Sequence, residues 1–179
     1  MLIITRPNFD EYTEFYAGYV ARIGDQDVLE VIHQQHPRTL ELLRSISEDQ
    51  ALFRPAPGEW TIKEVVGHMS DTERVFAYRA LRFSRNDPQE LLGFEQDDYI
   101  RESIFNDRLF SDLIDEFEAL RRANLYLFQN LTPEMLLRRG IASKASVTVR
   151  ALVYMTAGHE IHHYESLKTD YLPLMTKRA

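Results

Sequence analysis

The chain has 179 residues, of which 44% are hydrophobic, a length and composition that suit one domain with a continuous core. Its formal charge of -7 comes from 28 acidic and 21 basic residues that are mixed along the chain, so no basic stretch is available to bind a nucleic acid backbone. We therefore expect a single domain over residues 1–179 with no nucleic acid partner.

The chain contains no cysteine, and any bound metal must therefore be held by nitrogen and oxygen ligands. No apolar run approaches the roughly 20 residues that cross a bilayer, and the N-terminal sequence becomes polar too early for a signal peptide. These features predict a cytoplasmic protein without membrane contact, and they make the histidines the first candidates for a metal site.

Apolar residues recur at helical spacing along most of the chain, and no segment predicts a β-strand. The first expected helix is short and aromatic and covers residues 10–22 approximately. A longer helix should cover residues 26–46, and Pro37 should kink this helix or mark its restart.

Thr61 and Glu64 form a T-x-x-E capping box, which predicts the start of a second main helix that reaches about residue 83. A polar loop over residues 85–106 should follow. The third main helix is predicted by an inward seam of residues spaced three and four apart: Leu113, Phe117, Leu120, Asn124, Leu127 and Leu131.

Thr132 and Pro133 suit the cap and first position of a short turn. The stretch "GIASKASVTV", residues 140–149, is expected to be a loop, and a fourth main helix should cover residues 148–168. Four main helices in one small domain predict an all-α protein, a four-helix bundle with a short extra N-terminal helix.

The fourth helix contains "GHEIHH", residues 158–163, which fits the pattern H-E-x-x-H. His159 and His163 lie about 40° apart around the helix axis, so both imidazoles can reach one ion. His162 lies about 60° to the other side of His159, and spacing alone does not exclude it as the second ligand.

A catalytic metal site normally has three protein ligands and an open position, so a third ligand is required. His68 lies beside an apolar run on the second main helix and is the best inward-facing candidate. His33 and His36 occupy the polar stretch "HQQHP" and are expected to be solvated surface residues.

A zincin protease is excluded by the context of the motif. Only 16 residues follow His163, too few for a further helix with a distant glutamate ligand, and Ser166 and Thr169 replace the glycine and third histidine of a metzincin. Such proteases also hold their substrate against a sheet edge, and the sequence predicts no sheet.

Two segments, "RPAPGEWTIKEVVGHMSDTERVFAYRALRF" and "TVRALVYMTAGHEIHHYESL", resemble the DinB family, in particular its branch similar to the YfiT proteins. The resemblance implies a four-helix bundle with a divalent ion, zinc or nickel in most members, on one histidine of the second helix and an H-x-x-x-H pair of the last. His68, His159 and His163 match those positions, which decides against His162. The family motif does not require a glutamate, so Glu160 has no expected zincin role.

The resemblance implies a metal-dependent enzyme that acts on a small-molecule substrate. Family members resemble thiol S-transferases, which activate a low-molecular-weight thiol such as bacillithiol or mycothiol, or hydrolases, which activate water. The alternatives are a non-catalytic protein that binds a metal or small molecule, and a purely structural bundle with a vacant site.

Other residues of interest have less defined roles. Asp71 could orient His68 or be solvated, and Asp71 and Glu73 are the candidate general bases. Trp60 is expected to anchor its loop to the end of the bundle rather than to bind substrate. The aromatic N-terminal helix needs a cover, which favours packing into the core or a homodimer.

Overall fold

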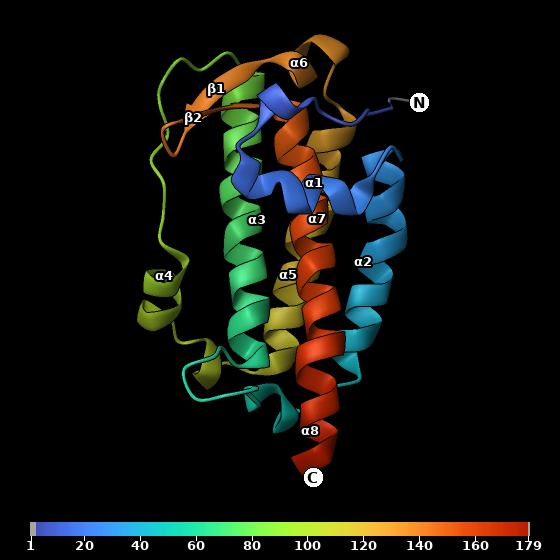
Figure 1. The fold of residues 1–179 in the computed structure, drawn as a ribbon, viewed down its shortest axis with the longest axis vertical. Coiled ribbons are helices and arrows are strands. Elements are labelled where there is room, and N and C mark those ends of the chain that lie inside the picture. Colours follow the sequence, from blue (N-terminus) through green and yellow to red (C-terminus); the bar gives the residue numbers. More distant parts are fainter. Residues whose placement is uncertain (1–2, 179) are drawn as a thin grey trace.

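In the computed structural model, which describes residues 3–178, four long helices lie side by side and form a bundle (Figure 1). This confirms the predicted all-helical bundle. The bundle helices are α2 (Val28–Arg44), α3 (Ile62–Ser84), α5 (Phe110–Gln129) and α7 (Val149–Ser166).

The shorter elements lie at the ends and on the side of the bundle (Figure 1). The short helices are α1 (Ala17–Ile23), α4 (Gln96–Glu102), α6 (Pro133–Leu137) and α8 (Leu172–Arg178). The single-turn elements are four 3-10 turns, Phe9–Glu11, Glu14–Tyr16, Gln50–Leu52 and Phe105–Asp107, and a π-helical turn, Leu167–Tyr171, that joins α7 to α8. None of the helices in residues 3–178 is both long enough and apolar enough to cross a membrane.

Side-chain caps define where the bundle helices begin. The predicted capping box is confirmed, because Thr61 Oγ1 accepts from the Glu64 backbone N–H at 3.1 Å while Glu64 Oε2 accepts from the Thr61 N–H at 2.7 Å. Thr148 caps α7 by accepting from the Ala151 N–H at 3.2 Å. These caps fix the first turn of α3 and of α7, the two helices that carry the histidines.

Three local predictions are wrong. Of the two alternatives at Pro37, the restart is wrong, because α2 is continuous through this residue. The segment predicted as a polar loop contains α4. Residues 140–149, predicted as a loop, belong mostly to an antiparallel hairpin of β1 (Arg139–Ala142) and β2 (Ala145–Thr148), in which Arg139 pairs with Thr148. The hairpin turn places Ser143 and Lys144 at positive φ, a conformation that sequence rules associate with Asn and Gly.

Along the two central helices, the apolar core is interrupted by polar residues at the same level. The buried apolar residues form two separate clusters. Phe76 of α3 and Ala157 of α7 belong to one cluster, whereas Met69 of α3 and Leu167, just after α7, belong to the other. The buried polar residues between these positions are Ser70, Thr72 and Glu73 on α3, and His159 and Glu160 on α7. The bundle therefore has a polar layer inside it.

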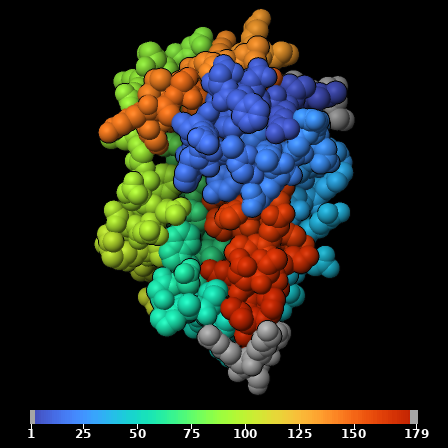
Figure 2. Space-filling model, viewed as in Figure 1, coloured from blue at the N-terminus to red at the C-terminus, as the bar shows by residue number. Residues whose placement is uncertain are grey.

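The N-terminal segment covers the first half of α7, as the blue surface over the orange-red helix shows in Figure 2. The helix α1 packs directly on α7 at Gly158, where a Cβ would lie 2.1 Å from the carbonyl oxygen of Tyr19. Only glycine permits this approach of the two backbones.

Replacing Gly158 by alanine should therefore displace α1 and lower the free energy of unfolding by roughly 1–3 kcal/mol. Denaturant unfolding followed by circular dichroism would measure the loss. Gly18→Ala on α1 is the matched control, because its new methyl would meet only the end of the Arg22 side chain at 3.4 Å, and it should be neutral or stabilising. Equal stabilities of the two variants would contradict the close contact.

Candidate metal centre

Three histidines converge between α3 and α7. The Nε2 atom of His159 lies 3.0 Å from the Nε2 atoms of both His68 and His163. One ring nitrogen from each residue lies within 4.8 Å of the others, and this is the one such group of metal-binding side chains in the described part of the chain. The helical spacing of the pair on α7 and the packing of α3 against α7 produce this convergence.

The imidazoles of the cluster are kept neutral by their surroundings. Burial, with a smaller contribution from His162, lowers the pKa of His68 to about 4. Burial and the neighbouring histidines lower the pKa of His159 and His163 well below the usual value. Neutral imidazole nitrogens are the form that binds a metal, so the donor set fits a divalent ion such as zinc or nickel.

Aromatic rings surround the cluster and fix the orientation of its members. The ring of Tyr19 meets His159 edge-on with centroids 5.4 Å apart, and the ring of Trp60 lies 4.8 Å from His68. Thr72 Oγ1 lies 3.5 Å from Nδ1 of His68. Trp60 also packs against the apolar cluster that includes Ile62 and Met69, in agreement with its predicted anchoring role.

His162 points away from the cluster. Its Nδ1 atom lies 3.3 Å from Nη2 of Arg22, and since a guanidinium only donates, the imidazole must accept. Arg22 is held in turn by Glu165 at 3.0 Å. The structure thus favours His163 over His162 as the second histidine of α7.

The two histidines of α2 have different environments. His33 is exposed, as predicted, and its Nε2 lies 3.1 Å from the side-chain amide of Gln129. The prediction that His36 is a solvated surface residue is wrong, because its side chain is 12% exposed and its Nδ1 lies 3.2 Å from Oε1 of Glu160. One position of the "HQQHP" stretch therefore faces the core.

The carboxylates near the cluster in sequence are all paired with arginines. Glu160 contacts Nη1 of Arg121 at 2.7 Å, and Glu73 accepts from Nε and Nη2 of Arg121 at 2.8 Å each. Asp71 pairs with Arg74 at 3.4 Å, and Thr72 instead of Asp71 is the side chain beside the His68 ring. The carboxylates of Asp71 and Glu73 thus have charged partners other than the histidines.

Sequence analysis missed Arg121, the largest fully buried side chain among the described residues. The predicted seam of the third helix passed through Leu120 and Asn124, whereas these residues are half-buried and the inward face includes Arg121. Its spacing of four from Phe117 was the available signal.

A cavity of about 330 Å³ lies beside the histidine cluster. Segments from four parts of the chain form its wall, which is rich in aromatic side chains, and they surround a hollow on the face seen in Figure 2. Its lining residues are Phe15, Tyr16, Tyr19, His68, Thr72, Phe76, Phe94, Glu95, Gln96, Asp97 and His159. The cavity brings a small molecule within reach of two of the three histidines.

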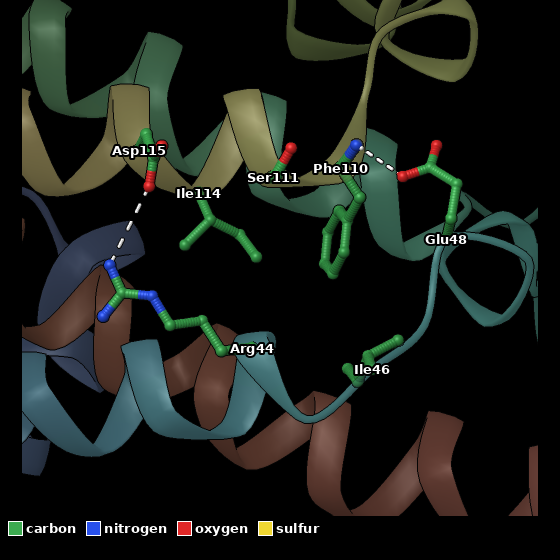
Figure 3. A pocket seen from close by; sticks show the side chains of 7 residues that line it. All are labelled: Arg44, Ile46, Glu48, Phe110, Ser111, Ile114 and Asp115. Atoms are coloured by element: carbon green, nitrogen blue, oxygen red, sulfur yellow. Dashed lines mark hydrogen bonds and ion pairs between the residues drawn. The ribbon is translucent and has the colours of Figure 1, made fainter.

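A second cavity, of about 230 Å³, lies away from the histidines between the end of α2 and the start of α5 (Figure 3). Its charged side chains are already paired, since Arg44 lies 3.8 Å from Asp115 and Glu48 accepts from the backbone N–H of Phe110 at 2.8 Å. The cavity beside the histidines is therefore the candidate site.

The geometry defines a four-helix bundle with a three-histidine centre. Residues 32–167 match the sequence profile of the DinB superfamily, and the chain belongs to this superfamily. No curated protein sequence matches the chain.

Two solved structures from Bacillus subtilis share the fold. YfiT, described as a probable metal-dependent hydrolase with an unusual four-helix bundle topology, aligns with a TM-score of 0.69 over 96% of this chain and 91% of its own, at 15% identity. The DinB-like protein YjoA aligns with a TM-score of 0.58 over 85% of this chain and 92% of its own, at 21% identity.

The lowered pKa of His68 predicts a pH dependence of stability in metal-stripped protein. The unfolded chain accepts a proton near pH 6.5, whereas folded His68 resists it until about pH 4, so the free energy of unfolding should fall as the pH decreases between these values. Thermal melts of His68→Gln should show a smaller loss than wild type over this range. His33→Gln, at an exposed histidine, is the control and should match wild type, while equal slopes for His68→Gln and wild type would contradict the assignment.

Proposed function

We propose that this protein is a metal-dependent enzyme whose divalent ion, zinc or nickel, is held by His68, His159 and His163. The observation that carries the proposal is the convergence of three neutral imidazole nitrogens within 4.8 Å at the edge of a cavity. Three protein ligands leave at least one position open on the ion. A divalent ion at such a position lowers the pKa of a water or thiol that occupies it.

The substrate should be a small molecule, because the adjoining cavity of about 330 Å³ is at the lower end of the range for ligand pockets. Its aromatic wall, which includes Tyr16, Phe76 and Phe94, would exclude water from the reacting atoms.

Two nucleophiles fit this site. A hydrolase that activates water is supported by the fold shared with YfiT, which is described as a probable metal-dependent hydrolase. An S-transferase that activates a low-molecular-weight thiol is supported by the pairing of Asp71, Glu73 and Glu160 with arginines, which leaves them poorly placed as general bases. A thiol with a pKa near 8.5 needs less help to lose its proton than water does.

Turnover assays separate these activities from a binding role. Metal-loaded protein would be incubated with monochlorobimane and a thiol, either bacillithiol or cysteine, and in parallel with a panel of esters and amides. Catalysed conjugation identifies a transferase, and catalysed hydrolysis identifies a hydrolase. Stoichiometric metal without either reaction would favour a non-catalytic binding protein.

Removing one histidine of the cluster should weaken metal binding severely. His68→Ala leaves two ligands, so we expect loss of stoichiometric zinc in elemental analysis while far-ultraviolet circular dichroism remains helical. His162→Ala is the internal control and should retain the metal, because its ring is directed toward Arg22. Stoichiometric zinc in His68→Ala would end the three-histidine assignment.

A further inference from the structure

A buried network of three charged side chains and one histidine lies beside the proposed metal centre and includes one residue from each of the four bundle helices. Arg121 of α5 is at its centre and contacts Glu73 of α3 and Glu160 of α7. Glu160 also contacts His36 of α2.

The network is closed to solvent. The side chains of Arg121, Glu73 and Glu160 are 1%, 2% and 1% exposed, respectively. A small space remains between these three side chains and the neighbouring Met69, Thr156 and His159. This space is too small to hold a water molecule. Charge interactions are strong in such a dry environment, and the geometry of the network is correspondingly stiff.

Both carboxylates remain engaged as ion-pair partners. Burial would by itself lower the pKa of Arg121, but the attraction of Glu160 and Glu73 raises it above the usual value. Glu160 is held by Arg121 through one carboxylate oxygen at 2.7 Å and by His36 through the other at 3.2 Å.

A buried ion network seldom stabilises a fold more than apolar residues of similar size would, because desolvation offsets the attraction. Its position suggests a different role. Glu73 follows His68 by five residues on α3, and Glu160 is adjacent to His159 on α7. One guanidinium therefore holds the two helices that supply the histidines, each close to a ligand position.

We propose that Arg121 is a positioning residue for the metal centre: by bridging Glu73 and Glu160 it sets the rotation and spacing of α3 and α7 at which His68, His159 and His163 converge. This inference rests on the proposed metal site. In this proposal the network determines the geometry of the metal site, and the stability of the bundle does not depend on it.

The test is the zinc affinity of Arg121→Lys, measured on metal-free protein by competition with a chromophoric chelator. Lysine keeps the positive charge but lacks the planar fork that holds two carboxylates at once. The variant should remain helical and bind zinc on the order of 10-fold more weakly, the lower end of the effect seen when groups behind metal ligands are changed.

Arg150→Lys is the matched control. Arg150 also lies on α7 and donates from Nε to the buried carboxylate of Glu11 at 2.7 Å, but at the start of the helix and away from the histidines. Its zinc affinity should stay within about 2-fold of wild type, because nothing in that pair contacts the site. Wild-type affinity in Arg121→Lys would overturn the proposal, whereas a wild type that binds no zinc would instead reject the proposed function.

A charge-free variant keeps the test decisive if Arg121→Lys does not fold. Glu73→Leu, Arg121→Met and Glu160→Leu together remove the three charges without leaving one unpaired. We expect this protein to fold and to bind zinc at least about 10-fold more weakly than wild type. Unchanged affinity would overturn the proposal, and so would failure to fold, because the network would then be required for the bundle itself.

Discussion

The packing of α3 against α7 is the contact on which the site depends. From Ala151 to Glu160, α7 is buried on all sides, because α1, α2 and α3 pack against it. A helix buried all round must be apolar nearly everywhere, so its polar residues are confined to positions where a partner meets them. His159 finds that partner in His68, and Glu160 finds it in Arg121.

Burial has opposite consequences for the two kinds of polar residue in this layer. It keeps the imidazoles of His68, His159 and His163 uncharged, which is the state a metal requires. The carboxylate of Glu160 is buried as deeply, yet the nearby guanidinium keeps its pKa low. Neutral donors and fixed charges are therefore neighbours within one dry region, and each is held in its form by a different physical cause.

Sequence reasoning reached the parts of this structure that depend on local signals. The capping box at Thr61, the four main helices and the convergence of His68 with the α7 histidines follow from spacing and from family resemblance. The hairpin was missed because its turn uses Ser143 and Lys144 instead of the usual residues. The pairing of Arg121 with two glutamates depends on the rotation of α5, and the predicted seam hid it by continuing from Phe117 to Leu120 instead of to Arg121, which lies about 100° further around the helix.

The motif H-E-x-x-H shows that the same local pattern can place its glutamate in different surroundings in different folds. In a zinc protease the glutamate acts as general base beside the two ligands, which requires it to face the substrate. Here successive side chains on α7 diverge by about 100° around the helix, so Glu160 points to a different neighbour from His159. That neighbour is Arg121, and His36 contacts the other carboxylate oxygen, so Glu160 faces the core. The pattern specifies which residues share a helix, and the packing of the other three helices decides what each of them contacts.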